Sequence, residues 1–303
     1  MLRLGASLPT SAPTGSSLPN LLLDDYEGGV RGYSLRKLKK DYSGYILRLR
    51  RSSDDEEVDV AFDDDNEFSA DSKLYNASGS TADGTLLSAW MGMSALYMTK
   101  WYDQSSAGLD IAQGTALLQP VLGAFGSFST SNGKNTVYFN GSTVLPLTST
   151  GLTYQSVSAY TVSENIDIDY AAYQWAWGLG ADLTFGCLQE YVGLGIGWNR
   201  FYYAGSQTPT YASSLEVQQI RTFHGGAGDF VVMYQNNAAG TGTGTTVTGS
   251  MSDGASTFMG SYYADASLFN WLGNFQEFIV FDTDTSSDRA AITTNLNDYY
   301  GTY

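Results

Sequence analysis

Apolar and polar residues alternate over much of the chain, which is the pattern of β-strands with one buried face. The alternation is clearest in residues 45–50 and 58–62, which flank an acidic turn at 54–57. We expect these two strands to pair, with their basic and acidic side chains together on the outer face. Further strands are predicted at 95–101, 109–113, 119–122, 157–162, 173–178, 188–196, 200–204, 215–221, 230–235 and 270–281.

Two segments follow the helical period instead. Leu86, Leu87, Trp90 and Met91 fall on one face of a short helix, which Asp83 is placed to cap. At the end of the chain, Thr285 and Asp288 have the spacing of a capping box. One face of the helix that follows carries Ile292, Leu296, Tyr299 and Tyr300. We expect this C-terminal helix to pack against the sheet edge.

Turn residues separate most of the predicted strands. Asn140-Gly141 predicts a type I′ turn in a hairpin over residues 137–145. Residues 238–257 are rich in Gly, Thr and Ser and predict a long loop with at most one strand. No repeat of fixed period is visible, which argues against a propeller or a solenoid.

The pattern predicts one domain that is preceded by an N-terminal tail. Residues 1–25 contain Pro9, Pro13 and Pro19 without sustained periodicity, and they predict an extended N-terminal arm. Leu21-Leu22-Leu23 is costly to leave in water and is expected to dock. Residues 26–303 then form one antiparallel β-sandwich.

Composition agrees with an all-β fold, since the chain has 34 Gly and 22 Tyr among its 303 residues. The net charge of −16 argues against nucleic acid as a partner, because phosphate is bound by clustered Lys and Arg. Eight of the 15 cations lie between residues 31 and 51, next to the acidic run 54–67. We interpret these charges as solvated faces that partly neutralise one another.

Residue counts exclude several kinds of site. Cys187 is the single cysteine and His224 the single histidine, so neither an intrachain disulfide nor a zinc site is expected. The acidic run 63–65 lacks the spacing of an EF-hand loop, and no cofactor is predicted. His224-Gly225-Gly226 is interpreted as a turn. No apolar run reaches the length of a membrane span or a secretion signal, so no membrane insertion is expected.

Residues 101–108, Trp-Tyr-Asp-Gln-Ser-Ser-Ala-Gly, are the densest aromatic and polar cluster in the first half of the chain. The rings, the carboxylate and the amide can either anchor a loop on the core or bind a sugar by stacking and hydrogen bonds. The spacing after the predicted helix favours Trp101 as a core residue. Asp103 and Gln104 then hold the following loop, with Tyr102 beside them.

A set of short motifs runs through the first part of the chain, namely Tyr33-Ser34-Leu35-Arg36-Lys37-Leu38, Tyr42-Ser43-Gly44-Tyr45, Arg48, Arg50-Arg51-Ser52-Ser53-Asp54, Trp101-Tyr102-Asp103-Gln104-Ser105 and Gln119-Pro120. This set resembles the opening of the α-L-arabinofuranosidase B catalytic domain and of related virion proteins from tailed phages. The resemblance covers residues 33–120 and implies a concanavalin A-like (laminin-G-like) lectin/glucanase sandwich. The sequence departs from the pattern at Ser106 and Ala107, and it lacks the enzyme's cysteines.

The resemblance also implies candidate site residues. The enzyme uses a Glu nucleophile and an Asp acid in its second half, and Glu190 and Asp265 are the nearest candidates by position. Glu190 is either an inward carboxyl with a raised pKa or the outward residue of an alternating strand. Glu277 is similarly open, and such a residue often bonds a neighbouring loop. Rings with amide neighbours that suit a glycan are Trp198, Asn199, Tyr202, Tyr262 and Tyr263.

From these observations we hypothesise that the chain is a non-enzymatic structural protein of a tailed-phage virion. The protein would be a head decoration or fibre-type subunit, assembled in the host cytoplasm as a homo-oligomer or within a symmetric array. Its arm would contact other virion proteins, and its sandwich would bind a cell-surface glycan. The alternatives are a glycoside hydrolase of the α-L-arabinofuranosidase type and a free carbohydrate-binding module.

Overall fold

The fold is given by a computed structural model of the chain. It describes residues 21–76, 81–147, 153–166, 173–179, 185–191, 197–203, 206–207, 211–213, 216–226, 232–239, 251–252, 258–261, 266 and 270–303. The strands predicted from the sequence are therefore compared with the structure only within these ranges.

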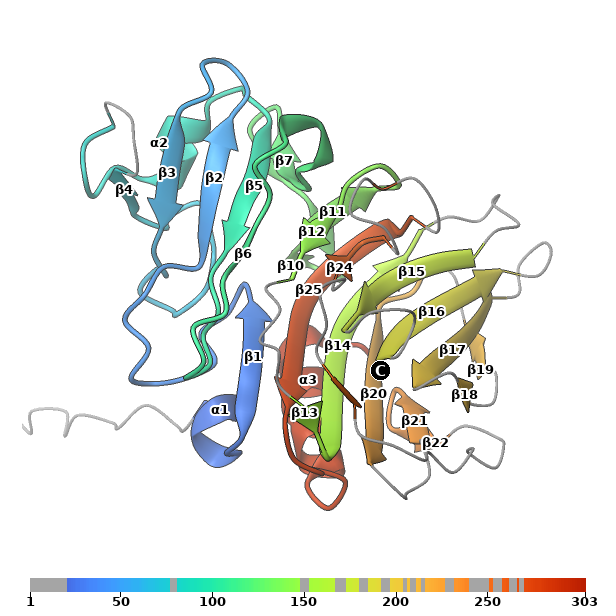
Figure 1. Ribbon diagram of the computed structural model, residues 1–303. Helices are drawn as coiled ribbons and strands as arrows, with labels where there is room; N and C mark the ends of the chain where they lie inside the picture. The colour runs from blue at the N-terminus through green and yellow to red at the C-terminus, as the bar shows by residue number, and fades with distance from the viewer. Residues whose placement is uncertain are drawn as a thin grey trace, which may run out of the picture.

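Within the described residues, fourteen strands form one curved antiparallel sheet (Figure 1). Its strands in spatial order are β22 (Ala238–Ala239), β21 (Val232–Gln235), β20 (Gln219–Gly226), β14 (Ser156–Asn165), β25 (Leu272–Phe281), β11 (Val137–Asn140), β7 (Val121–Ala124), β5 (Leu96–Trp101), β2 (Leu47–Arg51), β3 (Glu57–Val60) and β4 (Leu74–Asn76). The other three are β1 (Gly29–Ser34) on β25, β6 (Ile111–Ala112) on β5 and β8 (Ser127–Phe128) on β7.

Strand β25 lies at the centre of this sheet, which confirms the strand predicted there. It pairs along its length with β14 on one side, and with β11 and then β1 on the other. Phe275, Phe278 and Val280 belong to the main hydrophobic core, whereas Ile279 and Phe281 belong to a second apolar cluster. The strand is therefore apolar on both faces because both are covered.

A second sheet packs against the main core. Its strands are β12 (Leu145–Pro146), β24 (Phe258–Met259), β15 (Tyr173–Gly178), β16 (Phe185–Tyr191), β17 (Gly197–Tyr203), β18 (Ser206–Gln207) and β19 (Tyr211–Ser213). Trp177 of β15 meets Phe278 of β25 with ring centroids 4.8 Å apart, so the two sheets share one core. The all-β antiparallel sandwich predicted from the sequence is confirmed.

Two short two-stranded ribbons complete the described strands. They are β9 (Thr130–Ser131) with β10 (Lys134–Asn135), and β13 (Thr153–Tyr154) with β23 (Met251–Ser252).

The C-terminal helix α3 (Arg289–Tyr300) covers the outer face of the main sheet, where Figure 1 shows it behind β25 and β14. Ile292, Leu296 and Tyr300 are buried with apolar residues of the central strands, including Tyr160 and Ile279. The expected helix is confirmed, but its predicted position at the sheet edge is wrong. The unpaired apolar surface lies on the outer face of the central strands, and the helix follows it.

The short helix α1 (Leu22–Asp25) joins the same outer cluster. Leu22 and Leu23 are buried in it, which confirms that the leucine run docks. Residues 22–25 were expected to be extended and are helical instead, because the turn presents both leucines to one apolar cluster. The rest of the predicted arm, residues 1–20, lies outside the described residues.

The N-terminal strands form the predicted pair. Leu47 and Leu49 of β2 lie opposite Val60 and Val58 of β3, and all four are fully buried. On the outer face, the Arg48 guanidinium donates to both carboxylate oxygens of Asp59, at 2.9 Å each. The alternating sequence therefore sets both the pairing and the outward ion pair.

Three local predictions are wrong. Strands β11 and β12 belong to different sheets, so residues 137–145 are not a hairpin, and of Asn140-Gly141 only the glycine has a positive φ. Asp83 does not cap helix α2 (Leu87–Met91), which begins after Leu86 because the preceding residues hydrogen-bond to Leu74 of β4.

The predicted capping box before α3 is also absent. Asp288 is the residue that precedes the helix, but its φ and ψ of −97° and −5° are helical, and its side chain makes no capping bond. A capping residue normally has extended backbone, which aims its oxygen at the first free N–H groups.

A single turn of 3₁₀ helix, η1 (Ala116–Leu118), precedes β7. The predicted loop 238–257 is described only at β22 and β23.

Candidate functional site

The cluster that opens at Trp101 is a structural anchor. Trp101 ends β5 and is fully buried, and the Asp103 carboxylate accepts the backbone N–H groups of Gly32, Ser105 and Leu109, at 2.8 Å each. The Ser105 hydroxyl also donates to Asp103 at 2.8 Å. Burial raises the pKa of Asp103, and these four donors act against that rise. The predicted role in holding the loop is therefore confirmed.

Gln104 completes the anchor. Its Oε1 accepts the N–H of Leu38 at 2.8 Å, and its Nε2 donates to the carbonyls of Ser34 and Arg36 at 3.1 and 3.0 Å. Tyr102 is half-buried, and its hydroxyl donates to Asp59 at 2.6 Å. The amide and the carboxylate of this cluster are thus committed to the chain itself, which favours the loop anchor over the sugar site.

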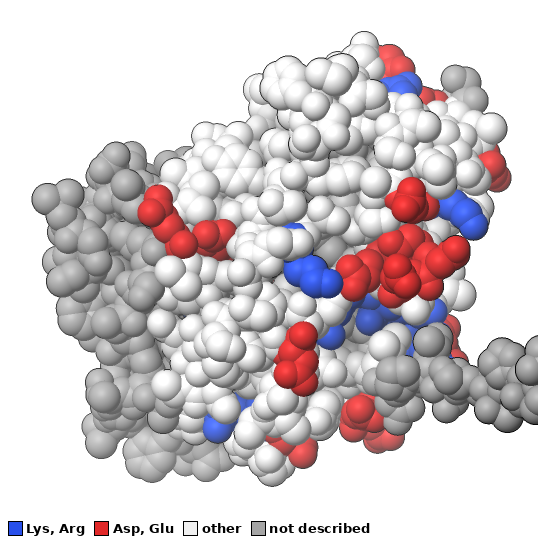
Figure 2. Space-filling view, turned by 180° about the vertical axis from the view of Figure 1, so that it is seen from behind, with Lys and Arg blue, Asp and Glu red and all other residues white. Residues whose placement is uncertain are grey.

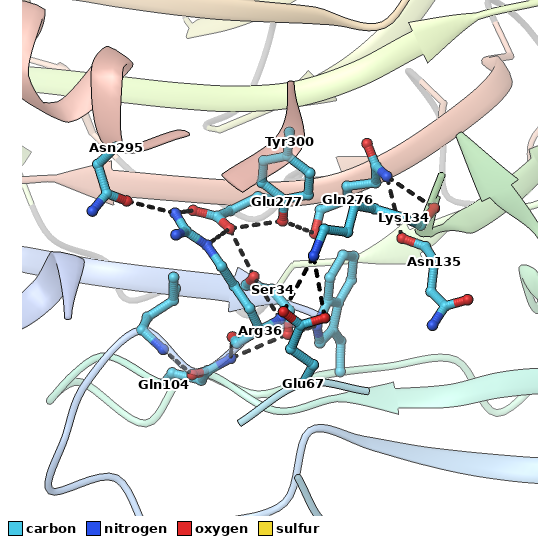
Figure 3. Close-up of polar contacts among 12 residues, drawn as sticks. Ser34, Arg36, Glu67, Gln104, Lys134, Asn135, Gln276, Glu277, Asn295 and Tyr300 are labelled. Atoms are coloured by element: carbon cyan, nitrogen blue, oxygen red, sulfur yellow. Dashed lines mark hydrogen bonds and ion pairs between the residues drawn. The ribbon is translucent and has the colours of Figure 1, made fainter. Parts of the chain in front are cut away.

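A buried ion pair lies beside this anchor (Figure 3). Glu277 of β25 is 1% exposed and accepts from the Arg36 guanidinium at 2.9 and 3.1 Å, from the Ser34 hydroxyl at 2.8 Å and from the Tyr300 hydroxyl at 2.8 Å. The register of β25 against β14 shifts at Gln276, so Gln276 and Glu277 are both turned toward the outer face. Glu277 therefore bonds a neighbouring loop and the helix, and it has no free oxygen for catalysis.

Of the two sequence-predicted catalytic candidates, Glu190 alone lies within the described residues. Glu190 lies in β16, with its backbone opposite Tyr173 of β15 and Trp198 of β17. Asp265 lies outside the described residues.

Some of the predicted glycan-binding residues lie within the described ranges, and others lie outside them. Trp198, Asn199 and Tyr202 lie in β17, where Asn199 is opposite Gln189 and Tyr202 is opposite Gly186. Tyr262 and Tyr263 lie outside the described residues. All three lie in the second sheet, because β17 begins at Gly197, whereas the strand predicted at 200–204 included only Tyr202.

A polar pocket that the sequence did not predict lies at one end of β14, β20 and β21. Its volume is about 270 Å³. The described residues that line it are Ser156, His224, Gly225, Gly226, Val232, Tyr234, Asp284 and Ser286. Because two glycines line the wall, the backbone of β20 can approach a ligand closely.

His224 is fixed by one neighbouring hydroxyl. Its Nδ1 lies 2.9 Å from the Ser158 Oγ, which also lies 3.0 Å from the Thr283 carbonyl and accepts the Thr285 N–H at 2.9 Å. The hydroxyl has one proton, and the carbonyl can only accept it. All three contacts are satisfied if Ser158 donates to Thr283 and Nδ1–H donates to Ser158. Nε2 is then a bare acceptor, and it is buried without a partner among the described residues.

This geometry is not a hydrolytic triad. The Asp284 carboxylate lies 3.8 Å from Nδ1, on the same ring nitrogen as Ser158. A Ser-His-Asp triad needs the serine and the aspartate on opposite nitrogens. Burial lowers the pKa of His224 to about 4, so the imidazole is neutral at pH 7.

The pocket instead has the groups that bind hydroxyls. The Asp284 side chain is 57% exposed, and one of its oxygens accepts from the Ser286 hydroxyl at 3.0 Å. The ring centroids of Tyr234 and His224 lie 6.2 Å apart. The guanidinium of Arg289, the first residue of α3, lies 3.8 Å from the centroid of the Tyr234 ring. A ring, a carboxylate and hydroxyls around a small cavity suit a polyhydroxylated ligand.

The interpretation of His224-Gly225-Gly226 as a turn is wrong. All three residues belong to β20, and Gly226 lies opposite Ser156. Two glycines suggest a turn, but pairing of all three residues with β14, and of His224 also with β21, keeps the segment extended. No alternation marks this strand, since Ile220 and Phe223 are three positions apart and pack into different apolar clusters.

The stability of the protein should depend on pH through His224. The folded-state pKa of about 4 lies below the ordinary value of 6.5, so the stabilisation is complete above pH 6.5 and is lost as the pH falls toward 4. Between pH 7 and pH 4.5 we expect a loss of roughly 2–3 kcal/mol beyond that of a His224→Gln variant. Urea unfolding of both proteins at the two pH values measures this difference. An equal loss in both proteins would contradict the assignment.

Other kinds of site are not seen in the described part of the chain. No three His, Cys, Asp or Glu side chains there are grouped to hold a metal ion. No described helix is long and apolar enough to cross a membrane. On the face shown in Figure 2, acidic and basic side chains lie next to one another rather than in separate fields.

Comparisons with known proteins identify the fold. The sequence matches no protein-family model and no curated protein. A mutant GH54 α-L-arabinofuranosidase soaked with 4-nitrophenyl α-L-arabinofuranoside has a TM-score of 0.57 and 16% identity, over 88% of this chain and 62% of that chain. An arabinofuranosidase complexed with arabinofuranosyl-α-1,2-xylobiose gives 0.55 and 14%, over 91% and 64%. The chain therefore spans less than two thirds of the length of these enzymes, and what it shares with them is the β-sandwich fold.

Proposed function

We propose that this chain is a lectin-like sandwich subunit of a tailed-phage virion that binds a cell-surface glycan. The observation that carries the glycan part is the pocket of His224, Tyr234, Asp284 and Ser286, on a fold that also occurs in arabinofuranosidases. The motifs at residues 33–54 and 101–105, which resemble openings of phage virion proteins, support the virion part.

The pocket favours a neutral sugar. The imidazole is uncharged at pH 7, and Asp284 would repel an acidic ligand while accepting hydroxyl protons. The net charge of −16 disfavours polyanions in general. The ligand class is therefore an uncharged mono- or oligosaccharide.

Saccharide titration tests this assignment. Isothermal titration of the full chain with neutral oligosaccharides that contain arabinofuranose, galactose or glucose should find at least one ligand. Asp284→Asn should weaken its binding by about tenfold or more, because hydrogen bonds to a charged group are lost. Asp55→Asn, at a side chain 76% exposed in another loop, is the matched control and should not change the affinity. Equal affinity in wild type and Asp284→Asn would contradict the pocket.

The virion part has a separate test. Mass spectrometry of purified phage particles that carry the gene should find the protein in a fixed ratio to the capsid or tail proteins. Particles that lack it would contradict this part and leave glycan binding to be judged by the titration.

A glycoside hydrolase of the α-L-arabinofuranosidase type is the second candidate, favoured by the fold likeness over 88% of the chain. The described residues give Glu190 no carboxyl partner opposite it in the sheet, since its neighbours there are Tyr173 and Trp198. We expect no release of nitrophenol from 4-nitrophenyl α-L-arabinofuranoside. Turnover that disappears in Glu190→Gln would establish the enzyme instead.

A further inference from the structure

The imidazole of His224 is confined at the wall of the pocket. The residue is 5% exposed in β20, and its partners in the sheet are Ser158 of β14 and Val232 of β21. Nδ1 faces the Ser158 hydroxyl, whereas Nε2 has no hydrogen-bond partner among the described residues. Because Nδ1 already carries the proton of the neutral ring, a second proton can be added only at the buried Nε2.

The Ser158 hydroxyl beside the imidazole also fixes the loop between β25 and α3. It donates to the Thr283 carbonyl and accepts the Thr285 N–H, on either side of Asp284. The Tyr160 hydroxyl lies 2.7 Å from the Thr285 hydroxyl and ties the loop at a second place. The backbone around Asp284 is therefore held, whereas the Asp284 side chain is 57% exposed and can change its partners.

Two charged groups face the imidazole from the described residues around it. Burial lowers the pKa of His224 to about 4 against the effect of the Asp284 carboxylate, which lies 3.8 Å from Nδ1 and favours the charged ring. The Arg289 guanidinium at the start of α3 favours the neutral ring. Tyr160 of β14 and Tyr234 of β21 meet the imidazole edge to face, at 5.7 and 6.2 Å, and are uncharged in acid. Among these neighbours, only Asp284 can pair with an imidazolium.

We propose that His224 is an acid-operated switch of the pocket, whose imidazolium draws the Asp284 carboxylate away from a bound ligand. This inference rests on the proposed function, because it assigns the regulation of the same pocket. While the ring is neutral, its one N–H is given to Ser158, and Asp284 is left to accept hydroxyl protons from a saccharide. Once the ring is protonated, its charge attracts the carboxylate across the 3.8 Å gap, and the pocket loses an acceptor.

The sign of the effect follows from the charge state of the ring. One pH unit above the pKa of His224, about nine rings in ten are neutral, and the pocket binds at full strength. As the pH falls through that pKa, the protonated fraction rises and the affinity falls. Linkage is reciprocal, so a saccharide that prefers the neutral ring lowers the pKa of His224 by the same free energy. The switch therefore releases the saccharide in acid.

Nuclear magnetic resonance tests the switch directly, because His224 is the single histidine of the chain. A titration of the isotope-labelled full chain from about pH 7.5 to about pH 3.5 follows the imidazole and the loop amides together. The amides of Asp284, Thr285 and Ser286 should shift with the midpoint of the imidazole. His224→Asn keeps an amide N–H beside Ser158 and takes up no proton, so it should abolish this shift. Effects of acid on other carboxyl groups are common to both proteins.

Two further measurements use the wild-type histidine as the probe. Asp284→Asn should lower the pKa of His224, because the carboxylate that favours the charged ring is lost. Asp55→Asn is the matched control and should leave that pKa unchanged, since Asp55 pairs with Arg50 in another loop. Saturation with the saccharide found by titration should lower the pKa by about 0.5–1 unit, which equals about three- to tenfold weaker binding to the protonated protein.

Three outcomes would overturn the proposal. The first is a set of loop amides that do not follow the imidazole in the wild-type protein. The second is an unchanged pKa of His224 in Asp284→Asn. The third is a saccharide that binds without moving this pKa, which would leave the proposed function intact and remove its regulation. If no saccharide binds, the proposed function fails at this pocket, and the first two measurements, which need no ligand, still decide whether the switch exists.

Discussion

Trp101→Ala should lower the free energy of unfolding by about 3–5 kcal/mol, because it leaves a large cavity at a fully buried position. The indole lies beside the Tyr33 ring, with centroids 6.0 Å apart, and its N–H donates to the Ser34 carbonyl at 3.4 Å. The destabilisation should therefore extend to β1. It should also extend to the segment after β1, because the Gln104 side chain donates to the Ser34 carbonyl at the end of that strand.

Urea unfolding at pH 7 measures the effect, and Tyr97→Ala serves as the control on the same strand. Tyr97 is half-buried, with its ring under the Arg50 guanidinium at 4.7 Å on the outer face of β5. We expect its removal to cost less than half as much as that of Trp101. A Trp101→Ala protein with the melting temperature of the wild type would contradict the core assignment.

Glu277→Gln should destabilise the fold by about 3–5 kcal/mol, because it leaves the Arg36 guanidinium in a nearly buried site without its counter-charge. The Arg36 side chain is 12% exposed and also donates to Asn295 at 2.9 Å. The guanidinium carbon of Arg36 lies 4.7 Å from the ring centroid of Tyr299 and 5.6 Å from that of Tyr300. These rings leave the guanidinium little access to water.

The ion pair of Lys134 with Glu67 provides the control for this prediction. It lies nearby in Figure 3, at 3.2 Å, but each side chain is about a third exposed. Glu67→Gln should therefore cost less than about 1 kcal/mol, as exposed pairs do. Equal losses for the two variants in urea unfolding would show that burial does not set the strength of the Arg36 pair.

Much of the fold could be predicted from local patterns. The alternation in residues 45–50 and 58–62 gave the pairing of β2 with β3 because one face of each strand is apolar. The apolar positions Ile292, Leu296 and Tyr300 gave helix α3. The predicted segment 173–178 coincides with β15. The predicted segment 215–221 begins four residues before β20 and ends five residues before its end, where His224-Gly225-Gly226 resembles a turn.

Less of the candidate site could be predicted. The role of Asp103 and Gln104 followed from their position after a core tryptophan, since polar residues at the end of a buried strand can satisfy the loop beyond it. The pocket joins Ser156, His224 and Asp284, which lie as much as 128 positions apart in the sequence. No local spacing relates them, because β14, β20 and the segment after β25 become neighbours only in the sheet.

The sequence by itself determined the all-β class, the loop anchor at Trp101 and the C-terminal helix, because each depends on residues close together in the chain. The tertiary structure decided which face the helix covers, the split of residues 137–145 between two sheets, and the pocket around His224. These features depend on pairings between distant strands, whose register is set by the packing of the whole core.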